Sequence, residues 1–215
     1  MSGGIEAVIW DFGGVITSSP FEAFNVYEAE HGLPKDFIRS VNAVNGDTNA
    51  WARLERSEVT GEEFDALFAA EARALGHEVP GRHVLALLSG RIRPAVVEAL
   101  KVCGENAKLG CITNNAPIGK GAGMSSDEGK AAAVAEVLSL FDHVIESSKI
   151  GIRKPDPRIY ALMCEALDVD PARCVYLDDL GINLKPARAM GMSTIKAVSE
   201  AQLLADLKAA TGFPI

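Results

Sequence analysis

The chain alternates short apolar runs with longer segments in which apolar residues recur every three or four positions. A nearly continuous apolar run is typical of a strand buried on both faces of a parallel sheet, whereas the longer period is typical of an amphipathic helix. The runs predict five strands, at Ala7–Trp10, Leu109–Ile112, His143–Glu146, Cys174–Leu177 and Thr194–Ala197. Their alternation with helices predicts an α/β fold with a doubly wound, parallel Rossmann-like sheet.

Helical patterns lie between and after the later strands, at Pro94–Val102, Pro157–Leu167, Asn183–Met190 and Glu200–Ala210. Two of them begin with recognisable start signals. Asp156 stands before Pro157, and Ser199 with Gln202 forms a capping-box pattern. These signals support the assignment of helices to the spaces between strands.

The alternation stops between about residues 21 and 88, where helical patterns follow one another and no good strand pattern occurs. They are centred on Phe21–Glu30, Phe37–Val41, Ala50–Arg56, Glu62–Leu75 and His83–Leu88. The chain is therefore predicted to consist of an α/β core, residues 1–17 and 92–215, and an all-helical insertion after the first strand, residues 18–91.

Polar residues that could take part in catalysis or ligand binding stand where predicted strands end. Asp11 closes the first strand and precedes Gly13 and Gly14, which let the backbone turn sharply and approach a ligand. The carboxyl ends of parallel strands form the edge at which open α/β sheets bind their ligands. Asp11 is therefore the first candidate catalytic residue.

Three further segments carry complementary groups. Thr113 ends K-L-G-C-I-T-N-N, Lys154 lies in G-I-R-K-P-D-P-R, and Asp178 and Asp179 end the strand in C-V-Y-L-D-D. One strand-end carboxylate is often only a turn or a helix cap. A nucleophile, a hydroxyl, an ammonium and paired carboxylates together are better explained by one shared site.

These four segments, in this order and spacing, resemble the motifs of the haloacid dehalogenase-like (HAD) hydrolases, most of which are phosphatases. The stretches N-G-D-T-N-A-W-A-R, K-P-D-P-R-I-Y and L-D-D-L-G-I-N-L-K-P-A-R are similar to the phosphatase-type domains that precede soluble epoxide hydrolase and certain acyl-CoA dehydrogenases. The resemblance implies that the helical insertion is a C1 cap, which would close over the sheet edge, exclude water and select the substrate.

The resemblance also implies roles for the strand-end residues. Asp11 would attack the phosphorus of a phosphomonoester and become an aspartyl phosphate. Mg²⁺ would be held by Asp11, Asp179 and the backbone carbonyl of Gly13, with Asp178 beside them, because hard cations prefer oxygen ligands.

The phosphate itself would be bound by the second and third motifs. Thr113 would offer its hydroxyl and N–H to a phosphoryl oxygen, with Asn114 and Asn115 next to it. Lys154 would neutralise the nucleophile and the phosphate. We also predict a cis peptide bond between Lys154 and Pro155, since the cis form costs little only before proline.

The cap contains a turn-rich break at residues 45–49, followed by Trp51 and Arg53. By resemblance, this stretch would point Trp51 and Arg53 into the site as substrate-binding residues. It could equally be a surface loop with one aromatic side chain packed beneath it. The sequence leaves both interpretations open.

Gly13 departs from the family pattern, which has a second aspartate at this position to protonate the leaving group. General acid–base help is typically worth about 10²–10⁴-fold in rate. Three interpretations follow: a phosphatase that works without this acid, a catalytically impaired module that binds a phosphorylated ligand, or a metal-independent dehalogenase. The paired aspartates at 178 and 179 disfavour the dehalogenase.

The glycine-rich segment Pro117–Lys130 fails the spacing of a nucleotide-binding P-loop and is predicted to be a flexible loop at the rim of the site.

The amino-acid composition agrees with these assignments. A net charge of −8 disfavours nucleic acids and anionic membranes as partners, and four cysteines without ligand spacing suggest small buried side chains in a reducing cytoplasm. The expected partner is a small phosphorylated metabolite, and the chain could form a homodimer.

Overall fold

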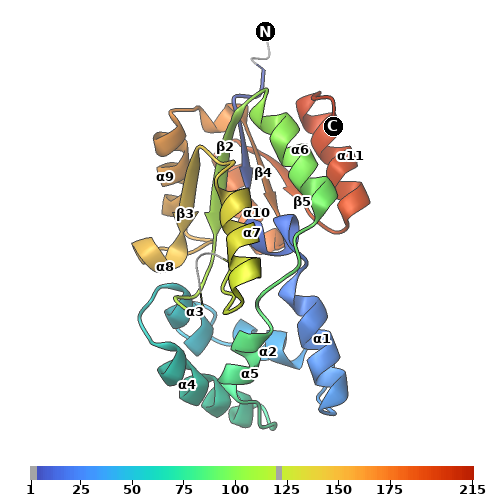
Figure 1. Ribbon diagram of the computed structural model, residues 1–215. Coiled ribbons are helices and arrows are strands. Elements are labelled where there is room, and N and C mark those ends of the chain that lie inside the picture. Colours follow the sequence, from blue (N-terminus) through green and yellow to red (C-terminus); the bar gives the residue numbers. More distant parts are fainter. Residues whose placement is uncertain (1–3, 120–122) are drawn as a thin grey trace.

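The computed structural model describes residues 4–119 and 123–215. Its centre is a five-stranded parallel sheet in the order β3-β2-β1-β4-β5 (Figure 1). The strands are β1 Ala7–Trp10, β2 Lys108–Thr113, β3 His143–Glu146, β4 Cys174–Asp178 and β5 Ser193–Lys196. Each overlaps a strand predicted from the sequence, so the expected α/β fold is confirmed.

Helices cover both faces of this sheet because β1 buries both of its faces. Val8 and Trp10 belong to the apolar cluster shared with α6 and α11, whereas Ala7 and Ile9 belong to the cluster shared with α9 and α10. All four β1 side chains are fully buried. The covering helices are α6 Pro94–Gly104, α7 Glu128–Leu138, α9 Pro157–Leu167, α10 Gly181–Ala189 and α11 Glu200–Thr211.

The remaining larger helices form a separate layer beyond the carboxyl edge of the sheet, in the lower part of Figure 1. They are α1 Pro20–Glu30, α2 Phe37–Ala43, α3 Ala50–Glu55, α4 Gly61–Ala74 and α5 Gly81–Ala86. These helices pack around an apolar cluster of their own, with Phe24, Phe64 and Phe68 fully buried in it. Ala116, from the loop after β2, joins this cluster and ties the helical layer to the sheet.

The two connections into and out of the helical layer lie side by side. Thr17 pairs with Ile92 in an antiparallel bridge, and the N–H of Ser18 donates to the carbonyl of Arg91 over 2.8 Å. Both connections leave the sheet close to the end of β1, the strand that delivers Asp11. The helical layer is thereby held over that strand end.

Two helices differ from the sequence expectations. The segment 117–130, expected to be a loop, already contains the first turn of α7, whose start is capped by the Asp127 side chain accepting from the N–H of Lys130. The run of alanines in α7 gave too weak an apolar period to reveal it. α8, Ser147–Ile150, is a single turn and too short for periodicity to show. Residues 120–122 of the expected loop lie outside the described residues.

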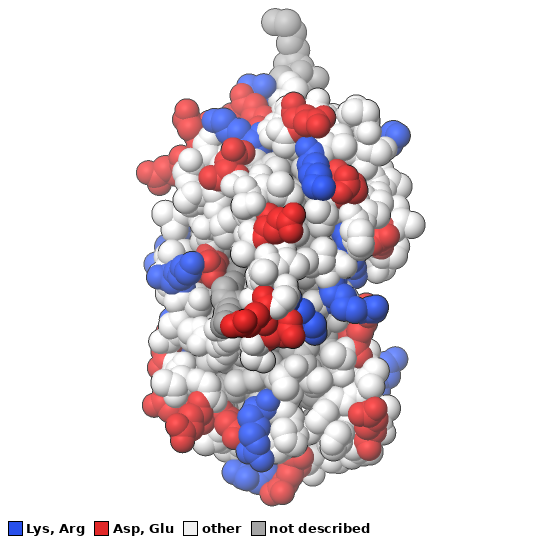
Figure 2. Space-filling view, viewed as in Figure 1, with Lys and Arg blue, Asp and Glu red and all other residues white. Residues whose placement is uncertain are grey.

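The surface and the cysteines agree with the composition. Figure 2 shows acidic and basic side chains intermingled over this face of the molecule. All four cysteines are buried and unpaired by disulfides. No helix within residues 4–119 and 123–215 has the length and apolar character needed to cross a membrane.

We predict that Phe64→Ala destabilises the helical layer strongly, because Phe64 is fully buried and packs edge-on against Trp51 and beside Phe68. Truncating such a side chain costs about 3–5 kcal/mol of unfolding free energy. Chemical denaturation followed by tryptophan fluorescence measures the loss. Val26→Ala, at a position that is 58% exposed, is the control and should change stability by less than about 0.5 kcal/mol. Equal effects of the two substitutions would contradict the assigned packing.

Candidate active site

The carboxyl ends of β1, β2 and β4 bring the predicted residues to one edge of the sheet, and the loop between α8 and α9 adds Lys154. The Lys154 ammonium lies 2.8 Å from Asp11 Oδ1 and 2.8 Å from Asp178 Oδ2. Its side chain is only 1% exposed. A fully buried ammonium between two carboxylates fixes the ends of β1 and β4 relative to the loop that carries Lys154.

Besides Lys154, several other hydrogen-bond donors hold the carboxylate of Asp178. Its Oδ2 accepts from the Tyr176 hydroxyl over 2.5 Å, and its Oδ1 accepts from the Leu180 N–H over 2.8 Å and from Asn183 Nδ2 over 3.0 Å. Tyr176 was not named from the sequence, although the two-residue period of a strand places it on the same face as Asp178. Because its oxygens already have these partners, Asp178 mainly balances the charge of Lys154.

Negative charge exceeds positive charge at this site. Burial raises the pKa of Asp11 well above its usual range, with the charges of Asp178 and Asp179 adding to the rise and Lys154 opposing it. Burial and the charge of Asp178 raise the pKa of Asp179 to about 6. Burial alone would lower the pKa of Lys154, but Asp11 and Asp178 raise it above its usual range. Three carboxylates facing one ammonium leave the site in need of a further cation.

The same three carboxylates form a candidate metal centre. Within the described part of the chain, Asp11, Asp178 and Asp179 offer ligand oxygens that all lie within 4.8 Å of one another. An all-oxygen donor set with excess negative charge suits a hard divalent cation such as Mg²⁺. This fit rests on the donor chemistry and the charge imbalance.

Gly14 allows Asp179 to approach β1. It has a φ of +79°, and a Cβ at this position would lie 2.3 Å from Asp179 Oδ2. The same carboxylate oxygen accepts from Ser19 Oγ over 3.4 Å. Any side chain at residue 14 would therefore displace a candidate metal ligand.

Gly13 is different, because its φ of −71° and ψ of 128° suit any residue. No other described atom lies within 4 Å of where its Cβ would stand. It opens onto a narrow cleft between the sheet edge and the helical layer, lined by residues that include Phe12, Gly13, Thr17, Leu88, Thr113 and Met124. The missing carboxylate is thus a property of the sequence and not a steric requirement of the fold.

Asn114 and Asn115 have distinct places. Asn114 brackets the backbone of Lys154: its Oδ1 accepts from the Lys154 N–H over 2.8 Å, and its Nδ2 donates to the Lys154 carbonyl over 3.0 Å. Asn115 is buried in the core, where its amide donates to Glu146 and accepts from Ser148. The Lys154–Pro155 peptide bond is cis, as predicted. Direct contacts of Thr113 and the two asparagines with substrate stay predictions.

The residues expected to bind substrate from the helical layer, Trp51 and Arg53, lie on α3. The Trp51 indole N–H donates to Glu55 Oε1 over 2.9 Å, and Arg53 is partly exposed. Residues 45–48 are exposed, and Asn49 caps α3 by accepting from the Ala52 N–H. Contacts of Trp51 and Arg53 with substrate stay predictions. Sequence reasoning did not name Glu55, whose buried carboxylate is the more informative feature of this stretch.

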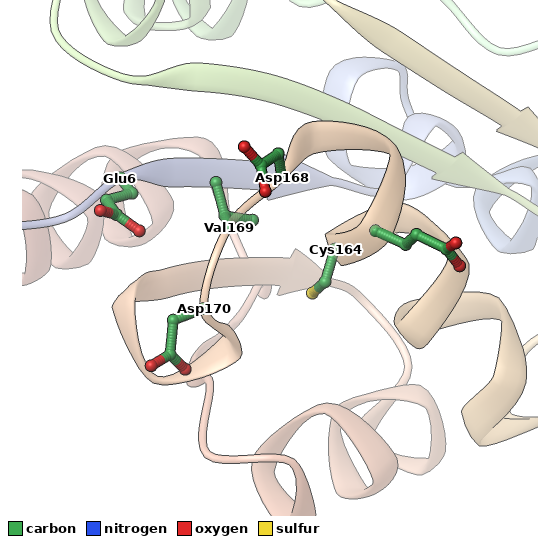
Figure 3. Close-up of a pocket in the computed structure, with 6 residues that line it drawn as sticks. Glu6, Cys164, Asp168, Val169 and Asp170 are labelled. Atoms are coloured by element: carbon green, nitrogen blue, oxygen red, sulfur yellow. The ribbon is translucent and has the colours of Figure 1, made fainter.

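A second hollow lies elsewhere, with a volume of about 310 Å³. Figure 3 shows it beside the start of β1 and the turn before β4, so it lies at the amino edge of the sheet. Its lining includes the carboxylates of Glu6, Glu165, Asp168 and Asp170. Four acidic side chains would repel a phosphate, so this hollow is not the predicted substrate site.

Comparison with known proteins decides the family. The family model for haloacid dehalogenase-like hydrolases matches residues 5–191. The chain belongs to this family of hydrolases. The family resemblance found in the sequence is therefore confirmed.

Curated relatives include phosphatases and larger, multidomain proteins. The chain is 32% identical to a phosphatase from Mycobacterium tuberculosis, over 87% of this chain and 85% of the relative. It is 31% identical to acyl-CoA dehydrogenase family member 10 of Mus musculus and 28% identical to bifunctional epoxide hydrolase 2 of Sus scrofa, over 98% and 97% of this chain. It spans only 19% and 39% of the lengths of those two proteins.

Solved structures show the same fold. A HAD family enzyme from Bacteroides thetaiotaomicron, in complex with magnesium and inorganic phosphate, superimposes with a TM-score of 0.56 at 19% identity. The similarity covers 92% of this chain and 97% of that one. It confirms the arrangement of sheet and helices.

We predict that the two glycines after Asp11 respond differently to alanine. Gly14→Ala should abolish the rise in melting temperature caused by MgCl₂, because its Cβ displaces Asp179. The left-handed backbone conformation should cost roughly 1–2 kcal/mol in addition. Gly13→Ala is the matched control and should keep the Mg²⁺-dependent rise. An equal response to MgCl₂ in both variants, measured by thermal denaturation, would remove Asp179 from the metal centre.

Proposed function

We propose that this chain is a Mg²⁺-dependent phosphatase that hydrolyses small phosphomonoesters through an aspartyl phosphate on Asp11. The observation that carries the proposal is the position of Lys154, whose ammonium binds both Asp11 and Asp178 within 2.8 Å beside the acidic cluster. The phosphatase among the relatives and the magnesium and phosphate in the similar structure support it.

In this proposal, Asp11, Asp179 and the carbonyl of Gly13 hold Mg²⁺, and Asp178 stays beside them as the partner of Lys154. When bound, the ion supplies positive charge that neutralises and orients the phosphate. Asp178 contributes indirectly, because the donors around it hold its carboxylate in place against Lys154.

The chain's own residues would perform two displacements. An oxygen of the Asp11 carboxylate attacks phosphorus, and the bond to the leaving oxygen breaks with its electron pair on that oxygen. Water then attacks the phosphorus of the aspartyl phosphate, which releases inorganic phosphate and regenerates the Asp11 carboxylate. Lys154 and the Thr113 hydroxyl bind the phosphoryl oxygens in both steps, where negative charge gathers.

The helical layer would act as the cap over this site. The bridge between Thr17 and Ile92 supports the proposed boundaries at residues 18 and 91, and the cleft beside Gly13 lies where a leaving group would be bound. The proposed substrate is a small phosphorylated metabolite of the cytoplasm. No carboxylate side chain extends from residue 13 into this cleft to protonate the departing oxygen.

Asp11→Asn should abolish turnover, because an amide oxygen is a poor nucleophile toward phosphorus. Asp179→Asn and Lys154→Ala should each lower kcat by at least about 100-fold, since each removes charge stabilisation at the transition state. Phosphate release from a panel of phosphoesters, with MgCl₂ or with EDTA, measures these effects, and circular dichroism checks that the variants are folded. Full activity in EDTA or in Asp11→Asn would refute the mechanism. A wild type that binds phosphate but turns over no ester would instead favour the phospho-ligand-binding module.

Because Gly13 has no side chain that could donate a proton, we predict that the rate of hydrolysis depends steeply on the leaving group. Aryl and acyl phosphates should be cleaved far faster than alkyl phosphates, because their leaving groups need little protonation. Gly13→Asp should raise the rate with alkyl phosphates by about 10²-fold or more, since the backbone at this position and the space around it accept a side chain. Gly13→Asn is the matched control, similar in shape but unable to donate a carboxyl proton. Similar wild-type rates for alkyl and aryl esters would show that another group already serves as the acid.

A further inference from the structure

The boundary between cap and sheet contains a buried carboxylate from the cap. Glu55, the last residue of α3, has a side chain that is only 8% exposed. It accepts from Trp51 Nε1 within the cap, and its Oε2 accepts from Arg153 Nε of the core over 2.6 Å. Burial raises the pKa of Glu55, and the neighbouring guanidinium of Arg153 opposes that rise. The carboxylate of Glu55 therefore joins the cap to the core through a buried ion pair with Arg153.

Arg153 contacts the cap a second time. Its NH1 donates to the carbonyl of Gly46 over 3.0 Å, in the turn-rich break before α3. Close by, the Ser57 hydroxyl donates to the carbonyl of Ser148 over 2.6 Å, where α3 packs against α8. The guanidinium thus bridges two parts of the cap, Gly46 and Glu55, which are nine residues apart in the sequence.

These contacts reach Lys154 by two routes. Arg153 is the residue immediately before Lys154, so its position constrains the Lys154 backbone. Asn114 Nδ2 lies 3.4 Å from Glu55 Oε2 and 3.0 Å from the Lys154 carbonyl, while Asn114 Oδ1 accepts from the Lys154 N–H. Both groups that hold the backbone of Lys154 are therefore in contact with Glu55.

We propose that the Glu55–Arg153 pair, here called the cap latch, couples seating of the cap to the placement of Lys154 on Asp11. Glu55 and Arg153 are positioning residues in this proposal and do not touch the reacting atoms. The role as a determinant of turnover rests on the proposed phosphatase function, whereas the placement of Lys154 does not.

An ion pair suits a contact that must open and close. A buried ion pair adds little net stability over apolar side chains of the same size, because burying the charges costs about as much as their attraction returns. When the cap lifts, however, both charged groups become hydrated, whereas separating an apolar contact would expose apolar surface to water. The cap latch can therefore hold the closed arrangement without preventing release.

The test uses the full chain and four variants: Glu55→Gln, Arg153→Gln, the double variant, and Glu58→Gln as control. Glu58 pairs with Arg56 in an exposed ion pair within the cap. Two quantities are measured for each, kcat with an aryl phosphate and the rate at which a lysine-specific acylating reagent modifies Lys154, followed by mass spectrometry. Lys149, whose side chain is 71% exposed, is the internal reference for reagent strength.

Each single latch variant should lower kcat by about 10- to 100-fold, because small misplacements of a catalytic group have effects of this size. Each should also speed the labelling of Lys154 relative to Lys149, and the double variant should be no worse than either single one. Glu58→Gln should change neither quantity. Unchanged kcat and unchanged Lys154 labelling in both single variants, with only a lower melting temperature, would overturn the proposal, and so would additive losses in the double variant.

A substitute variant and the separate labelling measurement keep the test decisive if a glutamine variant does not fold or the wild type is inactive. If a glutamine variant does not fold, Arg153→Lys keeps the charge but loses the planar fork that reaches both Gly46 and Glu55. It should then give the same increase in labelling. If the wild type hydrolyses no phosphoester, the proposed function fails, but faster labelling of Lys154 in the latch variants would still support the coupling, and unchanged labelling would overturn it.

Discussion

The buried ammonium of Lys154 is the interaction on which the rest of the site depends. It joins Asp11 at the end of β1 to Asp178 at the end of β4, although Lys154 itself comes from the loop between α8 and α9. Removing the ammonium would leave the buried carboxylates of Asp11 and Asp178 without their shared partner, which costs several kcal/mol. The tyrosine, asparagine and backbone donors around Asp178 and the amide of Asn114 behind Lys154 are best understood as supports for this one contact.

The charges at the site support the proposal that it binds a cation and then a phosphate. The carboxylates of Asp11, Asp178 and Asp179 outnumber the single ammonium, and burial makes this imbalance costly, as the raised pKa values of Asp11 and Asp179 show. A divalent cation would relieve the imbalance, and the resulting positive surface would then attract a phosphate.

The two glycines after Asp11 are adjacent in the sequence, but the fold requires a glycine only at residue 14. Gly14 has left-handed geometry and leaves room for Asp179, so a side chain there would disturb the acidic cluster. Gly13 has ordinary geometry and open space, so the fold would accept an aspartate there. In the proposed reaction, the lack of a carboxylate at this position affects the proton needed by a leaving group and leaves the architecture intact.

The sequence by itself determined the strands, the helical insertion and the strand-end residues Asp11, Thr113, Asp178 and Asp179. It could do so because apolar runs mark buried strands locally and because parallel strands must bring their carboxyl ends to one edge. It missed α7, whose alanines give a weak period, and α8, which is a single turn. Only the tertiary structure decided the order of the strands, the different roles of the two glycines and the contact between Glu55 and Arg153. Those two residues are 98 positions apart. Their side chains meet because the paired connections at Thr17 and Ile92 hold the helical layer over the sheet, and no local pattern along the chain records that arrangement.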